Sequence, residues 1–431
     1  MTRTLAVLSM HTSPLAQPGT GDGGGMNVYV RELCAALARS GVRCEVFTRA
    51  DHPASAPVVS VEPGFRVHHV PAGPALPVPK EHLPDLVPSW TAGVGDRLAD
   101  LAGAGTPVDA IHANYWLSGL AGHTLKHQLE VPLLVTFHTL DRVRADASPE
   151  ELSAAEPARR ALAEAEIVGC ADAVLASCSV EAEQLVELYD APPERIAVVP
   201  LGVDHAIFSP GRRSQARRAI GLAGVAPMVL FAGRIQPLKG LSLAVGALGL
   251  VRAEGREARR AGRETDAVLA DAVLVVAGGP SGPHGHEELE AVKRQVAGLS
   301  LDGAVRMLPP QRHEILSSYY RAADACVVPS HSESFGLVAL EAAACGAPVV
   351  ASAVGGLTTL VDDGRTGFLV EGREPSDYAQ PLAAILTDPR LGARLGSTGA
   401  LQAGAYTWSA AARGLWDRAE ALMSASLVAC A

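Results

Sequence analysis

Short apolar runs alternate with longer amphipathic stretches along almost the entire chain. Apolar runs of this length, bounded by turn-forming residues, predict β-strands, and the stretches between them predict helices. The predicted strands are LAVLSM (5–10), RCEVFTR (43–49), DAIHAN (109–114), PLLVTFH (132–138), AVLASC (173–178), IAVVPLG (196–202), PMVLFAG (227–233), AVLVVAG (272–278), AVRMLP (304–309), ACVVPS (325–330) and PVVASAV (348–354). Because strands buried on both faces show continuous apolar runs, the pattern predicts parallel sheets covered by helices on each side.

The first predicted helix follows the first predicted strand. In MNVYVRELCAALARSG, Tyr29, Leu33 and Leu37 fall on one helical face, and Gly41 supplies a stop signal. A polar, basic and proline-bearing stretch predicts a break between two halves of the chain near residues 203–225. A second polar stretch, at 281–290, predicts an exposed loop that leads into a helix. We therefore expect two doubly wound α/β domains with a cleft between them, which bind ligands at the carboxyl ends of their strands.

Composition favours a folded chain of two domains with buried sheets. The chain has 431 residues, more than one hydrophobic core usually serves, and 48% of them are apolar against 19% charged. The net charge of −10 argues against a nucleic-acid partner, because such proteins need basic surface to replace counterions on phosphates. We expect small-molecule partners and no nucleic acid.

The cysteines and the first residues suggest where the protein resides. Seven cysteines, an odd number, are widely spaced without a C-x-x-C pair: Cys34, Cys44, Cys170, Cys178, Cys326, Cys345 and Cys430. This pattern predicts reduced, mostly buried thiols, with neither a disulfide framework nor a zinc site. The opening MTRTLAVLSM has too short an apolar run for a signal peptide or a membrane span. We expect a cytoplasmic protein without a membrane partner.

A glycine-rich turn follows the first predicted strand. In HTSPLAQPGTGDGGGMN, Gly23, Gly24 and Gly25 let the backbone approach a ligand, and the following helix offers free N–H groups to an anion. The alternative is a flexible surface loop. The spacing matches neither the dinucleotide fingerprint nor the P-loop, so hydride transfer and ATP hydrolysis lose support.

The second half carries paired charges next to predicted strands. Arg234 and Lys239, in GRIQPLKG, follow a strand end, where two cations can hold a diphosphate and neutralise the charge of a departing nucleotide. Glu333 and Glu341, in SHSESFGLVALEAAACG, place one carboxylate in a loop and one in a helix. One can meet a sugar and the other the two hydroxyls of a ribose. The alternative for each pair is a solvated surface position.

The motifs together resemble a known family. SMHTSPLAQPGTGDGGGMNVYVRELCAALARSGV, HANYWLSG, TFHTL, PLGVD, FAGRIQPLKG, YRAADACVVPSHSESFGLVALEAAACGAPVV and GRTGFLV look like the corresponding segments of the D-inositol-3-phosphate glycosyltransferases of mycothiol biosynthesis. These are retaining GT-B glycosyltransferases with two Rossmann-like domains that face a central cleft. The resemblance covers most of the chain. It implies an N-terminal acceptor domain (1–205), a C-terminal donor domain (206–395), and a helical segment (396–431) that packs back toward the first domain.

The resemblance also implies roles for individual residues. Catalytic roles fall to His138, Arg234, Lys239 and Glu333. The donor would meet Gln17, Pro18, Gly25, Arg234, Lys239, Gln311, Glu333 and Glu341. The acceptor would meet His11, Asp22, Gly23, Gly24, Gly25, Met26, Asn27, Lys80, Tyr115, Thr139 and Arg159. Among these, Lys80, Tyr115, Thr139 and Arg159 would together bind one phosphate group, since a lysine, an arginine and two hydroxyls satisfy most of its oxygens.

For metal, the resemblance implies a possible Mg²⁺ on the backbone of Tyr320, Arg321 and Ala323. A threonine that completes such sites is replaced here by Ala347, and no D-x-D motif lies in a suitable loop. We therefore expect chemistry without an essential metal cofactor.

The implied reaction transfers N-acetylglucosamine from UDP-N-acetylglucosamine, as co-substrate, to 1D-myo-inositol 3-phosphate with retention, in the first step of mycothiol biosynthesis. A homodimer is implied as well. Three alternatives stay open: another GT-B transferase such as a sucrose-phosphate synthase relative, a nucleotide-sugar-binding module without activity, and a nicotinamide oxidoreductase on similar sheets. Fold alone does not choose among them.

Overall fold

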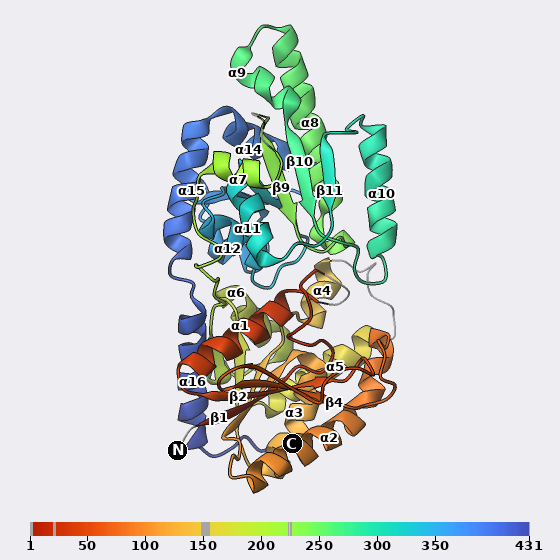
Figure 1. Cartoon of the computed structure of the whole chain (residues 1–431), viewed down its shortest axis with the longest axis vertical. Helices are drawn as coiled ribbons and strands as arrows, with labels where there is room; N and C mark the ends of the chain where they lie inside the picture. Colours follow the sequence, from red (N-terminus) through yellow and green to blue (C-terminus); the bar gives the residue numbers. More distant parts are fainter. Residues whose placement is uncertain (1–2, 20–22, 148–155, 223, 225, 431) are drawn as a thin grey trace. The chain divides into compact units, whose positions relative to one another are not determined.

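The computed structural model describes residues 3–19, 23–147, 156–222, 224 and 226–430. It divides into two compact units (Figure 1). Unit 1 comprises Met1–Ala16, Gly25–Gly202 and Trp408–Ala431, and unit 2 comprises Gln17–Gly24 and Val203–Thr407. These limits differ in three places from the ranges implied by the resemblance. The segment Gln17–Gly24 of the glycine-rich turn belongs with unit 2, and so do residues 203–205 and 396–407.

Unit 1 is built on one twisted sheet. Its strands are β1 (Thr4–Leu8), β2 (Arg43–Arg49), β3 (Val58–Glu62), β4 (Phe65–Val70), β5 (Ala110–Asn114), β6 (Leu133–Thr136), β7 (Ala173–Ala176) and β8 (Ile196–Val198). They lie in the order β3-β4-β2-β1-β5-β6-β7-β8. All neighbours pair in parallel except β3 with β4. The central strands β1, β5 and β6 are fully buried, as continuous apolar runs predict.

Helices cover both faces of this sheet. They are α1 (Gly25–Arg39), η1 (Lys80–Leu86), α2 (Val87–Gly103), α3 (Tyr115–Leu129), α4 (Asp141–Ala147), α5 (Glu156–Cys170), α6 (Ser179–Tyr189), η3 (Pro193–Arg195) and α16 (Trp408–Met423). Side chains of α2, α3, α5 and α6 form one core with the sheet. The helices α1 and α16 lie side by side (Figure 1), and the rings of Tyr29 and Trp408 meet at 6.1 Å.

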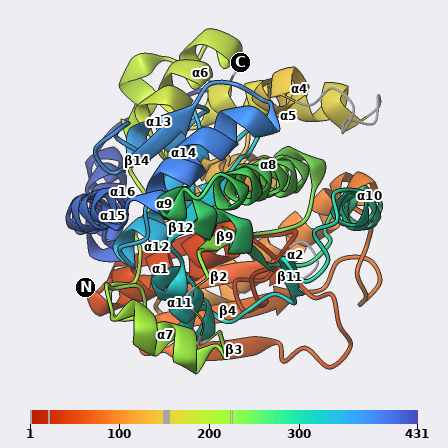
Figure 2. The same cartoon turned by 90° about the horizontal axis from the view of Figure 1, so that it is seen from above.

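Unit 2 repeats the plan with a smaller sheet. Its strands are β9 (Met228–Ala232), β10 (Val273–Ala277), β11 (Val305–Leu308), β12 (Ala325–Val328), β13 (Val349–Ser352) and β14 (Gly367–Val370). The order is β11-β10-β9-β12-β13-β14, and all pairs are parallel. The helical segments are α7 (Arg213–Ala219), η4 (Pro237–Lys239), α8 (Leu241–Arg260), α9 (Glu264–Ala267), η5 (Val268–Asp271), α10 (Gly285–Gly298), α11 (His313–Ala322), α12 (Leu337–Ala344), α13 (Leu357–Leu360), α14 (Pro375–Thr387) and α15 (Pro389–Ala403). The helices α8 and α14 pack side by side on the sheet (Figure 2).

The structure confirms every strand predicted from the apolar runs and the doubly wound class of both units. Three strands were not predicted: β3, β4 and β14. Strand β3 is an edge strand with partly exposed residues, so it lacks the apolar run that marks a central strand. Within the described ranges, no helix is both long and apolar enough to span a membrane.

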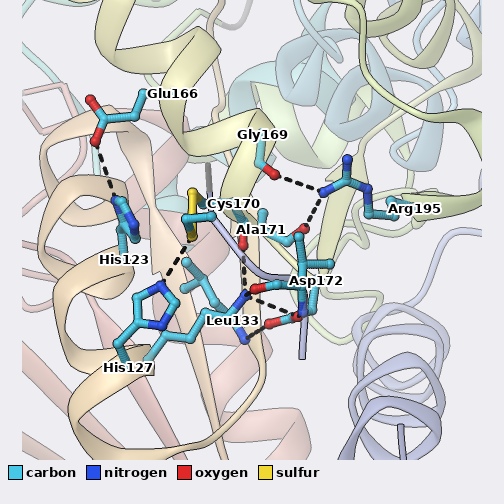
Figure 3. Close-up of a disulfide and its surroundings, with 12 residues drawn as sticks. His123, His127, Leu133, Glu166, Gly169, Cys170, Ala171, Asp172 and Arg195 are labelled. Carbon is cyan, nitrogen blue, oxygen red and sulfur yellow. Dashed lines mark hydrogen bonds and ion pairs between the residues drawn. A yellow bond between two sulfur atoms is a disulfide. The ribbon is translucent and has the colours of Figure 1, made fainter. Parts of the chain in front are cut away.

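The prediction of seven reduced cysteines is wrong for one pair. A disulfide joins Cys170 to Cys430, which are 260 positions apart with their Cα atoms 5.1 Å from each other (Figure 3). The other five cysteines are buried and form no disulfide within the part of the chain that the structure describes. Spacing in the sequence could not reveal this pair, because only the return of the C-terminal tail to unit 1 brings Cys430 beside the end of α5.

Candidate active site

Both sheets have a switch point at their first strand. In unit 1, β1 lies between β2 and β5, and in unit 2, β9 lies between β10 and β12. The connections after the two central strands therefore leave in opposite directions and open a crevice at the strands' carboxyl ends, where doubly wound proteins bind ligands. His11 and Tyr115 follow β1 and β5, and Arg234 and Glu333 follow β9 and β12. These four sequence-predicted residues therefore lie at the switch points of the two sheets.

In unit 2 a cation and a carboxylate meet across the switch point. Lys239 Nζ lies 2.6 Å from Glu333 Oε2, which also accepts a hydrogen bond from Ser330 Oγ at 3.3 Å. The two loops are joined through their backbones as well, since His331 N donates to Leu238 O at 2.8 Å. Both charged side chains are partly exposed, at 25% and 19%. The pair is thus fixed in place yet open to a ligand.

Glycines allow this close approach of loops. Gly240 has φ +65°, and a Cβ there would lie 2.1 Å from Pro329 O. Gly355 has φ +47°, and a Cβ there would lie 1.9 Å from Glu333 O. Its neighbour Gly356 donates its N–H to Glu333 O at 3.0 Å. Side chains at the two left-handed positions would push the loops apart, so the glycines are needed to hold Lys239 and Glu333 together.

Arg234 contacts the glycine-rich turn. A Cβ on Gly24 would lie 3.5 Å from both Cζ and Nε of the guanidinium, so the bare backbone of Gly24 packs on this cation. Gly19 contacts Pro310, where a Cβ would approach to 3.0 Å. Gln17 and Pro18, predicted to meet the donor, lie in this same segment of unit 2. Asp22 lies outside the described residues.

Glu341 lies in a buried polar cluster of unit 2. Its Oε2 accepts from Tyr320 Oη at 2.9 Å, and its Oε1 lies 4.0 Å from His313 Nε2. Burial raises the pKa of Glu341 above its usual range. Gln311 follows β11, and its side chain donates to Pro309 O at 2.7 Å. The Glu341 carboxylate is therefore a hydrogen-bond acceptor fixed by Tyr320, whereas the Glu333 carboxylate pairs with Lys239.

The residues proposed for Mg²⁺ make a poor site. Tyr320 and Arg321 lie in the last turn of α11 and Ala323 follows its end, but Tyr320 O already accepts from Ala323 N at 3.3 Å. Ala347 offers only a methyl group and is buried. Mg²⁺ requires near-octahedral oxygen coordination. The protein atoms here do not fit a dedicated magnesium site, and we derive no step through one.

In unit 1 the two switch-point loops meet through aromatic rings. The rings of His11 and Tyr115 lie 4.4 Å apart. Tyr115 has φ +74° and His138 has φ +64°. This left-handed conformation costs a non-glycine residue about 1–3 kcal/mol, and such residues are concentrated at functional sites. Each of these two residues follows a central strand. Two left-handed residues therefore lie at the carboxyl edge of β5 and β6, where the resemblance predicts the acceptor site.

The predicted phosphate-binding residues do not all converge. Tyr115 Oη accepts from Arg160 Nη1 at 3.1 Å, and Thr139 accepts from Arg160 Nη2 at its carbonyl oxygen (2.5 Å) and its hydroxyl (3.0 Å). Arg159 instead points to Asp85, with Nη1 3.2 Å from Oδ1. Lys80 begins η1, the segment that also carries Asp85. The structure thus joins Tyr115 and Thr139 through Arg160, which the sequence reasoning missed.

Arg160 is held by acidic partners. Its Nε donates to Glu164 Oε1 at 2.7 Å, Asp141 Oδ1 lies 3.9 Å away, and the guanidinium stacks 4.8 Å over the Tyr115 ring. Burial opposes the charge, but Tyr115, Glu164 and Asp141 raise the pKa of Arg160 above its usual range. The spacing of Arg160 and Glu164, four positions apart on a helix, was a signal that could have found it.

Asn27, in the first turn of α1, is hydrogen-bonded to the loop after β1. Its Nδ2 donates to Thr12 Oγ1 at 2.7 Å and to Ser13 O at 2.5 Å, and the residue is buried. Gly25 and Met26 precede it in the first turn of α1. The two donors of Asn27 are therefore occupied by the protein, which favours a positioning role for this side chain.

His138 is a buried, neutral imidazole. Its Nε2 lies 2.9 Å from Asn114 Oδ1, and its ring meets Tyr29 edge-on at 4.9 Å. Burial, aided by His112 and His11, lowers the pKa of His138 to about 3. Asn114, which sequence reasoning did not single out, buries its Nδ2 without a hydrogen-bond partner among the described residues. Such an unpaired donor beside a histidine is typical of a site that a ligand completes.

Two domain families match the chain in succession. Residues 24–202 match the glycosyl transferase 4-like domain, and residues 212–402 match the glycosyl transferases group 1. These two ranges lie almost entirely in unit 1 and unit 2, respectively.

Among solved structures, the chain is similar to sucrose-phosphate synthase from Thermosynechococcus elongatus, with 32% identity, a TM-score of 0.85, and coverage of 98% of this chain and 100% of that one. It shares its fold with the Anabaena protein HepE in complex with UDP and glucose, at 18% identity, TM-score 0.71, and coverage of 97% of this chain and 100% of that one.

Curated relatives extend over nearly the whole chain. The protein is 46% identical to the D-inositol 3-phosphate glycosyltransferase of Geodermatophilus obscurus, over 94% of this chain and 86% of that protein. It is 45% identical to that of Actinosynnema mirum, over 94% of both. With this identity over this length, and with two Rossmann-like units carrying the two domain families, the chain belongs to the D-inositol 3-phosphate glycosyltransferase family of GT-B glycosyltransferases.

Proposed function

We propose that the protein transfers N-acetylglucosamine from UDP-N-acetylglucosamine to 1D-myo-inositol 3-phosphate, with retention at the anomeric carbon and release of UDP. The names of its relatives support the inositol phosphate acceptor. The resemblance of its motifs implies the donor and the place of this reaction as the first step of mycothiol biosynthesis. The single observation that carries a transferase reaction is the Lys239–Glu333 pair at the switch point of unit 2, with Arg234 in the same connection after β9 as Lys239.

The donor site that we propose depends on the positive charges of two side chains. A nucleotide diphosphate that departs gains negative charge, and Lys239 and Arg234 supply fixed positive charge where β9 ends. Lys239 reaches Glu333 at 2.6 Å, so the carboxylate holds the ammonium group in position before the donor binds. Glu341, an acceptor already anchored by Tyr320, would receive hydrogen bonds from ribose hydroxyls. The backbone of Gln311 would meet the base.

The acceptor half rests on Tyr115, Thr139, Arg159 and Lys80 as phosphate ligands, with Arg160 as a positioning residue. Arg160 is buried and fixes both hydroxyl-bearing residues. Arg159 is exposed and forms a surface ion pair with Asp85, a weak interaction that a phosphate could replace. His138, neutral at physiological pH, would hydrogen-bond a hydroxyl of the transferred sugar.

The chemistry proposed needs no carboxylate nucleophile. The acceptor hydroxyl oxygen bonds to the anomeric carbon, the bond from that carbon to the β-phosphate oxygen breaks, and the hydroxyl proton passes to the departing phosphate. The new bond forms on the face that the leaving group vacates. The protein then contributes positioning and charge stabilisation. No essential metal cofactor is part of this proposal.

The test is a substrate matrix. The protein is incubated with UDP-N-acetylglucosamine or UDP-glucose and with inositol phosphate isomers or fructose 6-phosphate, and products are identified by mass and by the anomeric coupling in NMR spectra. We expect an α-linked N-acetylglucosaminyl inositol phosphate. A product formed only with a hexose phosphate would overturn the proposal.

Sucrose-phosphate synthase activity is the second candidate, since the identity to that enzyme is 32% over 98% of this chain. The same matrix separates the two. Light scattering on the purified protein tests the homodimer that the resemblance implies.

A further inference from the structure

A cluster of metal-binding side chains lies in unit 1, among residues that the proposed reaction does not use. His123, Cys170 and Cys430 bring their ligand atoms within 4.8 Å of one another. His127 adds a fourth, because its Nε2 lies 3.0 Å from Cys430 Sγ. Figure 3 shows the two histidines on one side of the Cys170 sulfur atom. The four residues supply two sulfurs and two nitrogens.

Three segments of the chain build this cluster. His123 and His127 are four positions apart on α3, which places both rings on one helical face, with centroids 5.3 Å apart. Cys170 is the last residue of α5. Cys430 comes from the tail beyond α16. Two histidines at this spacing, together with two cysteines, make a ligand set suited to zinc.

The tail is anchored beside the cluster by a buried ion pair. Lys126 Nζ donates to Asp172 Oδ1 at 3.0 Å, to Cys170 O at 2.7 Å and to Val428 O at 2.9 Å. Val428 N returns a hydrogen bond to Asp172 Oδ1 at 2.7 Å. Lys126 and Asp172 are almost wholly buried. The position of Cys430, two residues beyond Val428, is thus set by the fold and does not depend on the sulfur–sulfur bond alone.

A carboxylate lies next to one of the histidines. Glu166 Oε1 lies 3.4 Å from His123 Nδ1, which orients the ring. Histidines that bind metals commonly pair their second nitrogen with a carboxylate in this way. A disulfide by itself requires neither the two imidazoles nor this carboxylate.

We propose that in the reduced protein His123, His127, Cys170 and Cys430 bind one Zn²⁺ ion in a four-coordinate site that clamps the C-terminal tail to α3 and α5. Two thiolates balance the charge of the ion. Bonds of about 2.3 Å at the tetrahedral angle would separate the two sulfurs to about 3.8 Å. Because Cys430 lies outside the helices, beyond the end of α16 at Met423, this needs only a local shift.

The oxidised and metal-bound forms exclude each other. A phosphine reductant gives two electrons to the disulfide and becomes the phosphine oxide with an oxygen from water, and the two sulfurs become thiols. Binding of Zn²⁺ then releases the two thiol protons. A diazene oxidant such as diamide takes two electrons and two protons from the thiols and restores the disulfide. The site therefore holds a metal only while both cysteines are reduced.

The test uses Co²⁺ as a spectroscopic probe on the full chain, reduced with a phosphine and freed of metal by chelation. We expect one equivalent of Co²⁺ per chain, with tetrahedral d–d bands and a thiolate charge-transfer band, both removed by Zn²⁺. Diamide treatment should abolish binding. If the reduced chain shows no such bands, the proposal fails and the pair is a disulfide only.

Variants locate the site. Cys430→Ser and His127→Ala should each lose the tetrahedral spectrum, whereas His286→Ala, an exposed histidine of unit 2, should keep it. Glu166→Gln should weaken Zn²⁺ by about 10-fold, the low end for an outer-sphere partner, because this carboxylate is more than half exposed. Circular dichroism checks that each variant folds. Unchanged Co²⁺ spectra in Cys430→Ser would place the metal elsewhere and overturn the assignment.

Discussion

Lys239 Nζ lies 2.6 Å from Glu333 Oε2, so the cation at the end of β9 is fixed by a carboxylate from the loop after β12. The two residues are 94 positions apart in the sequence. Their meeting at the switch point turns two separate motifs into one charged site, and the first prediction follows from it.

Lys239→Ala should reduce kcat by about 10²–10³-fold, because the variant loses a fixed cation where charge develops on the departing diphosphate. The KM for the inositol phosphate acceptor should stay within about twofold of the original, since the residues proposed to bind its phosphate group, Lys80, Tyr115, Thr139 and Arg159, all lie in unit 1. Steady-state kinetics with both substrates measures this. Lys293→Ala, which removes an exposed lysine paired with Glu290, is the matched control and should leave kcat and KM unchanged. Near-normal turnover in Lys239→Ala would remove the electrostatic argument.

Gly240→Ala should impair both stability and turnover, whereas Gly262→Ala should affect only stability. Both glycines have positive φ, so each substitution costs roughly 1–2 kcal/mol of backbone strain. Only at Gly240 would the new Cβ also meet a backbone atom, Pro329 O at 2.1 Å; at Gly262 nothing lies within 4 Å. The clash should displace the loop that carries Glu333. Thermal unfolding and kcat distinguish the two effects, and equal losses of kcat would contradict the role of this turn.

Arg159→Ala and Arg160→Ala should separate ligand binding from stability. Arg159→Ala breaks the exposed ion pair with Asp85, which typically contributes about 0–1 kcal/mol to the free energy of unfolding. The same variant should raise the KM for inositol phosphate by at least about 10-fold. Arg160→Ala leaves the buried Glu164 carboxylate without this cation, and breaking a buried ion pair in this way typically costs about 3–5 kcal/mol. Urea unfolding followed by fluorescence is a clean probe here, because all four tryptophans, Trp90, Trp116, Trp408 and Trp416, lie in unit 1. A stable Arg160→Ala variant with an unchanged KM for inositol phosphate would argue against its positioning role.

Unit 1 should lose stability as the pH falls from 7 to 5, in part through His112. Burial lowers the pKa of His112 from 6.5 to about 3, so the unfolded chain takes up a proton over this interval and the folded chain does not. Because the unfolded state binds more protons, stability rises with pH, and this residue should contribute about 2 kcal/mol between the two pH values. His112→Gln should flatten the pH dependence of urea unfolding by that amount. His286→Gln, at an exposed position, should leave the slope as it was.

The local pattern of apolar residues was sufficient to predict most of the strands. It also placed several candidate site residues at the carboxyl ends of strands in both sheets. Continuous apolar runs marked the central strands because those strands are buried on both faces, and a strand's own residues carry that signal. The positions of Arg234, Lys239 and Tyr115 just beyond such runs also placed them at carboxyl ends. An edge strand such as β3 gave no comparable signal, since its residues are partly exposed.

The tertiary structure decided which of two adjacent arginines is buried. Arg159 and Arg160 are equivalent in composition, but a helix turns by about 100° per residue, so only one of them can face Glu164, Tyr115 and Thr139. The glycine-rich turn likewise belongs with unit 2, although it lies at the start of the chain. The periodicity of apolar residues in the sequence does not indicate which of two adjacent arginines is buried, or which unit a segment joins.

The apolar pattern of the sequence determined the class of fold, and its motifs indicated the family. Pairings between distant segments, Lys239 with Glu333 and Cys170 with Cys430, arose only from the way the chain returns on itself. The physical reason is that burial and secondary structure depend on neighbours along the chain, whereas contacts across 94 or 260 positions depend on the packing of whole elements.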